Sequence, residues 1–139
     1  MSVVTLPPAP STAHRSFLAF DFGTRRIGVA SGNSLTRSAQ PLRTIATTGE
    51  ARFEAIARLI AEWQPDALVV GVPFHPDGAA HENTERARRF ARQLAGRFAL
   101  PVHEVDERYS TTEALSEGAR DLDAASAAII LDQFLTTLP

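Results

Sequence analysis

Residues 67–72 read ALVVGV, a run of six residues without a polar side chain that ends at Pro73. A short run of this kind, rich in β-branched residues, indicates a strand, and its lack of alternation indicates that both of its faces are covered. Amphipathic patterns flank the run, because apolar residues recur at helical spacing over 50–63 and again over 82–98. The chain is therefore expected to place helices on both faces of a sheet in which this strand is central.

Shorter apolar segments predict the remaining elements. We expect four further strands, at 17–22, 26–31, 41–46 and 101–105. The sequence STTE at 110–113 is typical of a capping box and predicts a short helix that ends near Gly118, and a last helix begins near Asp123. The order β-β-β-α-β-α-β-α-α predicts an α/β fold with a mixed central sheet and helices on both faces.

Length and composition restrict the kind of protein. A chain of 139 residues with 44% apolar residues favours one folded domain, which we assign to 17–139 after a flexible tail at 1–16. The tail has no basic start followed by a long apolar stretch, and no apolar run approaches the roughly 20 residues of a membrane span, so we expect a cytoplasmic protein. The absence of cysteine excludes disulfides, thiolate zinc sites and a cysteine nucleophile.

Acidic residues stand at the ends of predicted elements. Asp21 ends an otherwise apolar strand, Asp106 and Glu107 follow another, and Asp123 opens the last helix. Each could be an ordinary surface group: Asp21 a turn residue, Glu107 a partner of Arg108, and Asp123 a helix cap. Ligands of open α/β sheets, however, lie beyond the carboxyl ends of the parallel strands. Since a buried charge is costly without a partner and carboxylates suit Mg²⁺ or Mn²⁺, the acids together favour a metal site.

The basic residues leave two interpretations open. All 14 are arginines and the formal net charge is −2, which argues against a generally basic nucleic-acid surface. Four of them lie largely off the apolar face of the helix predicted at 82–98, namely Arg86, Arg88, Arg89 and Arg92. They indicate either a solvated helix face or a set of phosphate contacts.

Several motifs occur in an order that resembles the YqgF family: FDFGTRRIGVA, VVGVPFHPDG, ARRFARQL, VDERYSTTEA and DAASAAIILDQFL. The resemblance covers about residues 17–138. It implies an RNase H-like fold similar to RuvC-type resolvases, with Asp21, Glu107 and Asp123 as catalytic ligands of Mg²⁺ or Mn²⁺. The implied activity is hydrolysis of phosphodiester bonds, either at the 5′ end of pre-16S rRNA or in branched DNA such as a Holliday junction.

The implied chemistry assigns roles to further residues. Arg25 and Arg26 are candidate contacts to the nucleic-acid backbone, and Arg108, Ser110 and Thr111 are candidates to orient the phosphate. Segment 112–122 carries Arg120 as its only cation, whereas the family commonly has a longer and more basic segment there. We therefore expect weak binding by the isolated protein and a partner that supplies basic surface, either a ribosomal particle or a second subunit.

Two other functions are compatible with parts of the pattern. A non-catalytic RNA-binding module in ribosome assembly would keep the fold, and the net charge and the short 112–122 segment favour it. A small actin-like ATP-binding domain would share the DxGxxxxG opening. That class needs two such domains, so a chain of 139 residues disfavours it.

Overall fold

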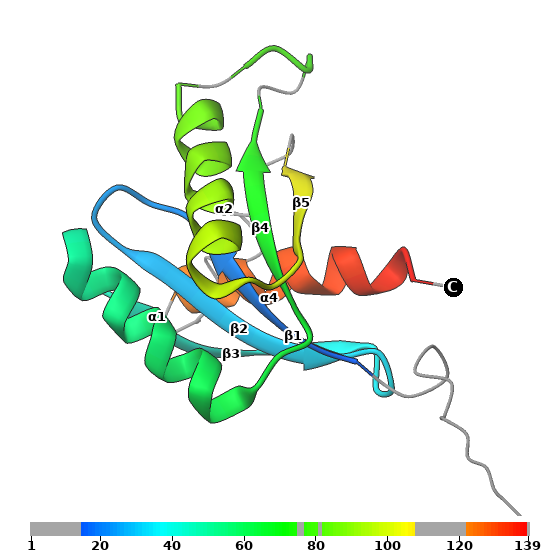
Figure 1. Ribbon diagram of the computed structural model, residues 1–139. Coiled ribbons are helices and arrows are strands. Elements are labelled where there is room, and N and C mark those ends of the chain that lie inside the picture. Colours follow the sequence, from blue (N-terminus) through cyan, green and yellow to red (C-terminus); the bar gives the residue numbers. More distant parts are fainter. Residues whose placement is uncertain (1–14, 75–76, 81, 108–121, 139) are drawn as a thin grey trace, which may run out of the picture.

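Five strands form one mixed sheet in the order β3-β2-β1-β4-β5 (Figure 1). The computed structural model describes residues 15–74, 77–80, 82–107 and 122–138. The strands are β1 (Ser16–Asp21), β2 (Ile27–Asn33), β3 (Ser38–Ile45), β4 (Ala67–Pro73) and β5 (Val102–Glu107). The described helices are α1 (Gly49–Trp63), α2 (Thr84–Phe98) and α4 (Leu122–Thr136). The helix expected after 110 and most of the expected tail lie outside the described residues.

Strand direction follows from the connections. β1 pairs antiparallel with β2, which in turn pairs antiparallel with β3, while β1, β4 and β5 are parallel neighbours. The short turn after Asp21 allows only an antiparallel return, whereas α1 and α2 provide the long crossovers that parallel strands need. The predicted mixed sheet is confirmed, and the carboxyl ends of β1, β4 and β5 meet at one edge.

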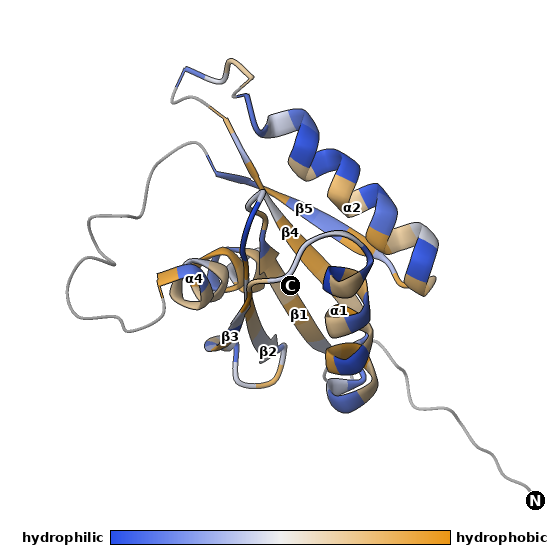
Figure 2. Ribbon diagram, turned by 90° about the vertical axis from the view of Figure 1, so that its left-hand side faces the viewer, coloured by the Kyte–Doolittle hydropathy of each residue, from blue (hydrophilic) through white to orange (hydrophobic). Residues whose placement is uncertain are grey.

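The two faces of the sheet carry separate hydrophobic cores. Leu18 and Phe20 of β1 pack beneath α1 and α2, whereas Phe17 and Ala19 pack against α4. Figure 2 shows this three-layer arrangement, with α4 on one side of the sheet and α1 and α2 on the other. Alternation along β1 therefore decides which face each residue enters.

β4 confirms the prediction that the uninterrupted apolar run forms a central strand covered on both faces. Its residues 67–72 are all buried because it lies between β1 and β5 with helices over both faces. No described helix is long and apolar enough to cross a bilayer.

β3 is longer than the sequence predicted. It begins at Ser38 rather than at 41 and runs through Pro41, which pairs with Ala30 beside an irregularity in the β2–β3 register. Proline cannot donate to a sheet ladder, but an edge strand has one side without a neighbour and tolerates it. The sequence therefore predicted a strand that begins only at Pro41, because the edge position that tolerates the proline is known only from the sheet order.

Gly28 sets how closely α4 approaches the sheet. A Cβ atom at this position would overlap the backbone carbonyl of Asp123 in the first turn of α4. Because glycine has no Cβ, the amino-terminal turn of α4 lies directly on β2. Gly28 is therefore a packing residue.

We predict that Gly28→Ala destabilises the protein, since the backbone of α4 would have to move away from β2. Overpacking of this kind costs about 1–3 kcal/mol or more. Gly96→Ala is the matched control: no atom lies within 4 Å of its Cβ position in α2, and alanine favours a helix by roughly 0.5–1 kcal/mol. Urea unfolding of both variants tests this, and equal stabilities would contradict the close approach.

Candidate active site

Asp21 ends β1 between two glycines. In the sheet register it pairs with Gly28 of β2 on one side and with Gly71 of β4 on the other. Residues in register point to the same face, and the odd-numbered residues of β1 face α4. The half-buried Asp21 carboxyl therefore lies beneath α4 with no side chain beside it on either neighbouring strand.

Glu107 reaches this place from β5. β4 separates β5 from β1, so the two backbones lie about 10 Å apart. A Cβ atom at Gly71 would overlap the carboxyl group of Glu107, which shows that this carboxyl lies across β4 at the position paired with Asp21. A larger residue at 71 would stand between the two acids.

The two neighbouring acids of β5 are separated by the strand itself. The sequence placed Asp106 and Glu107 after a strand ending at 105, but β5 runs to Glu107. Successive residues of a strand point to opposite faces, so only Glu107 faces α4 and the other acids. The pleat thereby distinguishes Glu107 from its neighbour.

α4 contributes the third acid and a hydroxyl group. Asp123 stands in its first turn, and Ser126, one turn further, donates a hydrogen bond to the Asp21 carboxylate. The positive end of a helix dipole favours negative charge, so the amino-terminal turn of α4 suits this arrangement. Asp123 also forms an ion pair with Arg26, in which Nε lies 3.2 Å from Oδ2.

Burial and mutual repulsion raise the pKa values of Asp21 and Glu107. Burial raises the pKa of Glu107 to about 8, with further contributions from the charges of Asp21 and Asp106. Burial also raises the pKa of Asp21 to about 6, the charge of Asp123 adds to this, and the Ser126 hydrogen bond opposes it. Asp21 is the central group, since it interacts with both of the other acids.

These carboxylates suit a divalent ion in chemistry but do not enclose one as they stand. Within the described ranges, no three acidic or histidine side chains are grouped closely enough to hold a metal. The ion pair explains part of this, because Arg26 holds the Asp123 carboxylate. Hard oxygen donors with raised pKa values are groups that a cation would stabilise in their charged form.

The structure brings together only some of the predicted site residues. Arg25 and Arg26 are exposed in the turn between β1 and β2, and only Arg26 contacts an acid of the site. Arg108, Ser110 and Thr111 lie outside the described residues. Sequence reasoning missed Gly71 and Ser126. An isolated glycine in an apolar strand is the signal that could have revealed the close approach at 71.

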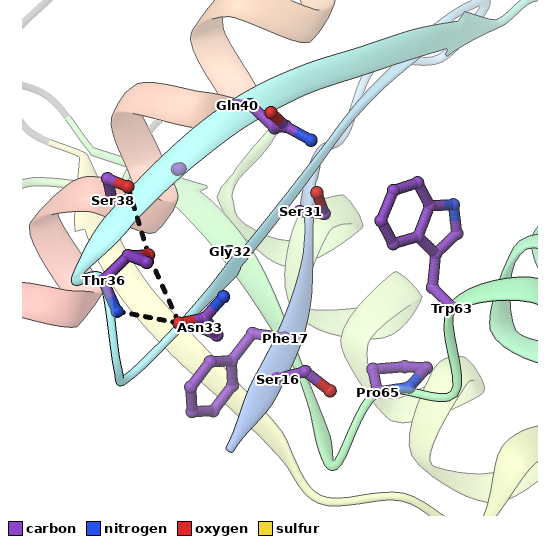
Figure 3. A pocket seen from close by; sticks show the side chains of 11 residues that line it. Ser16, Phe17, Ser31, Gly32, Asn33, Thr36, Ser38, Gln40, Trp63 and Pro65 are labelled. Atoms are coloured by element: carbon purple, nitrogen blue, oxygen red, sulfur yellow. Dashed lines mark hydrogen bonds between the residues drawn. The ribbon is translucent and has the colours of Figure 1, made fainter. Parts of the chain in front are cut away.

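A separate cavity of about 310 Å³ lies at the opposite end of β1 (Figure 3). It is lined by Ser16 of β1, the β2–β3 hairpin and Trp63, and no ionisable side chain is among its described lining residues. In the hairpin, Asn33 Oδ1 accepts hydrogen bonds from the backbone and hydroxyl of Thr36. The polar groups of this cavity thus stabilise a turn. Five residues of β1, a length of about 17 Å, separate the cavity from Asp21.

Comparisons with known proteins agree on one family and one fold. Residues 15–137 match the family described as "RuvX: Holliday junction resolvase". A Polaromonas protein named "Putative pre-16S rRNA nuclease" is 65% identical over 139 residues, which is 100% of both chains. A protein of the same name from Albidiferax ferrireducens is 70% identical over 124 residues, covering 89% of this chain and 80% of that protein.

A solved structure supports the architecture. The structure titled "T. thermophilus RuvC in complex with Holliday junction substrate" aligns with a TM-score of 0.56 at 17% identity, covering 88% of this chain and 94% of that one. At this identity the likeness concerns the fold alone. It confirms the RNase H-like architecture that the sequence motifs predicted.

We predict that Glu107→Gln stabilises the metal-free protein increasingly as the pH rises. The folded-state pKa of Glu107, about 8, exceeds its ordinary 4.5, so the folded protein keeps this proton where the unfolded chain has lost it. Stability therefore falls between about pH 4.5 and 8 in the wild type, and the amide removes this loss. Thermal unfolding in EDTA at pH 5 and pH 8 measures it, with exposed Glu62→Gln as the control. An equal gain at both pH values would contradict the raised pKa.

Proposed function

The chain belongs to the RuvX (YqgF) family, and from this premise we propose that it is a metal-dependent nuclease that hydrolyses phosphodiester bonds in pre-16S rRNA. The observation that carries the proposal is the convergence of Glu107 and Asp123 on Asp21 at the edge where the parallel strands end. The names of the full-length relatives support the substrate.

The donor set fits Mg²⁺ or Mn²⁺. Asp21 would hold the ion together with Glu107 and Asp123, and all three supply the hard oxygen atoms that these ions prefer. A bound divalent ion supplies positive charge that offsets the charge developing on the phosphoryl and leaving oxygens. Without the ion, the Glu107 carboxyl holds a proton at neutral pH, because its pKa is raised to about 8. Ion binding would therefore release protons.

Other residues of the chain would bind and orient the substrate. Ser126 fixes the Asp21 carboxylate through its hydrogen bond. Arg26 leaves Asp123 once that carboxylate is engaged elsewhere, and the exposed pair costs little to break, about 0–1 kcal/mol. The freed guanidinium can then contact a phosphate, as can Arg25. We assign the orientation of the phosphate to Arg108, Ser110 and Thr111.

Partners and place of action follow from the substrate. A pre-rRNA substrate implies action in the cytoplasm, and the single cation of segment 112–122 favours a ribosomal particle or a second subunit as a source of basic surface. The family description favours a Holliday junction as the alternative substrate. A non-catalytic RNA-binding module would differ from both by lacking metal-dependent cleavage.

We predict that Asp21→Asn abolishes cleavage while the protein remains folded, since the amide keeps the shape of the carboxylate but removes its charge. The assay compares wild type, Asp21→Asn and Glu62→Gln on a pre-16S rRNA 5′ leader and on a four-way junction, with Mg²⁺, Mn²⁺ or EDTA. Cleavage of the leader by wild type and Glu62→Gln alone supports the proposal, and cleavage of the junction alone favours the alternative. Equal cleavage by Asp21→Asn would remove Asp21 from catalysis.

We also predict that Mg²⁺ or Mn²⁺ raises the melting temperature of the wild type. A ligand at ten times its Kd stabilises the folded state by about 1.4 kcal/mol, which corresponds to roughly 4 °C for a domain of this size. Asp21→Asn should lose the shift and Glu62→Gln should keep it. Absence of a shift in the wild type at millimolar ion would contradict the metal site, whatever the cleavage assays give.

A further inference from the structure

A second cavity, which we call the arginine groove, lies beside the end of β1 on the face opposite the acids. It has a volume of about 230 Å³ and lies between the first half of α1 and the first half of α2. Arg52, Arg86 and Arg89 line it together with Gln93, and no acid is among its described lining residues. In a chain whose formal net charge is −2, a cavity lined by three cations is a marked concentration of positive charge.

Arg52 is a buried cation held by neutral groups. Only 7% of the residue is exposed, and its guanidinium donates hydrogen bonds to the backbone carbonyls of Thr47 and Thr24, at 3.1 Å and 3.2 Å. It also lies over the ring of Phe22, at 5.8 Å from the ring centroid. Among the described residues no carboxylate pairs with it, and a buried charge without a counter-charge favours an anion beside it.

Ion pairs divide the arginines of α2 into two groups. Arg88 lies 3.5 Å from a carboxylate oxygen of Glu104, and Arg92 lies 2.7 Å from one of Glu85. Arg97 likewise pairs with Glu50 of α1, so three of the five arginines of α2 have their counter-charges in the protein. Arg88 and Arg92 therefore agree with the interpretation of this helix face as an ordinary solvated surface.

The remaining two arginines line the groove. Arg86, Arg89 and Gln93 stand at i, i+3 and i+7 of α2, a spacing that places them on one face of the helix. Arg86 contacts the side-chain amide oxygen of Asn83 at 3.1 Å, and among the described residues no carboxylate forms an ion pair with it. Within the described ranges Arg89 forms no ion pair. The described part of the chain therefore places no acid against the arginines of α2 that face the groove.

The amino-terminal turn of α1 borders the groove, and the acid of this turn, Glu50, is already paired with Arg97. Gly49, the first residue of α1, lines the groove, and the preceding Thr48 makes no side-chain capping bond. Free N–H groups and the positive end of the helix dipole attract anions. Aromatic rings of Phe22, Phe53 and Phe90 form the apolar wall.

We propose that the arginine groove binds a phosphodiester group of the nucleic-acid substrate, on the far side of β1 from the acids. The inference rests on the proposed function for the identity of the nucleic acid. Phe22 of the groove follows Asp21 directly, so a strand that crosses the end of β1 reaches both places. The volume is below the roughly 300 Å³ at which sites for whole small molecules begin, which favours one phosphate of a longer chain over a free nucleotide.

The test measures binding without cleavage. In the Asp21→Asn background, a fluorescent single-stranded RNA of the pre-16S leader is titrated at several salt concentrations. Arg89→Gln and Arg86→Gln should each weaken binding about tenfold near physiological salt, the loss of one charge-assisted contact. Each should also reduce the slope of log K against log salt by about 0.7, the value for one phosphate of a single strand. Arg58→Gln, an exposed arginine of α1 away from the groove, should change neither quantity.

The outcomes separate the two proposals. Unchanged affinity and slope in both groove variants, with melting temperatures equal to that of the background protein, would overturn the groove whether or not the wild type cleaves RNA. Weakened binding with no cleavage by the wild type would support the groove and contradict the nuclease. Displacement of the RNA by millimolar inorganic phosphate or AMP as readily as by unlabelled RNA would also overturn it, since the ligand would then be a free anion.

Discussion

The repulsion between acids that meet at the end of β1 is the constraint on which the site depends. A carboxylate in a half-buried place needs a partner, and Asp21 has Ser126 and two further acids. The sheet permits this meeting because both register neighbours of Asp21 are glycines. One glycine lets the first turn of α4 lie on β2, and the other leaves room for Glu107. The acids of the site can thus approach and repel one another because both register neighbours of Asp21 are glycines without side chains.

The end of β1 separates opposite charges. Asp21 points toward α4, whereas the next residue, Phe22, packs on the other face near the buried guanidinium of Arg52. The net charge of the chain conceals this division, because negative and positive groups nearly cancel in the sum. Without a divalent ion, a polyanion would be repelled by the acids and attracted by the arginines. A nuclease would therefore need both a cation bound at the acids and phosphate binding in the groove.

Sequence reasoning performed best where the signal is local. Apolar periodicity identified the central strand and the long helices, and the motifs suggested as metal ligands three acids that the fold brings near one another, Asp21, Glu107 and Asp123. It failed at β3, where Pro41 is acceptable only because the strand is at the edge, and at the end of β5, which includes both acids. It also treated the arginines of α2 as one set. The counter-charge of Arg88 is Glu104 on β5, and only the fold brings it to the helix.

The order of the elements, the faces that they bury and the residue types available for chemistry follow from spacing along the chain, so they could be predicted without the structure. Tertiary structure alone decided which groups meet. Asp21 and Glu107 are 86 residues apart in sequence, and their approach depends on strand register and on Gly71. The pairing of Arg26 with Asp123, and the isolation of Arg52 from any described carboxylate, likewise depend on packing. These contacts act over a few ångströms between residues that are far apart in sequence, so no pattern of neighbouring residues reveals them.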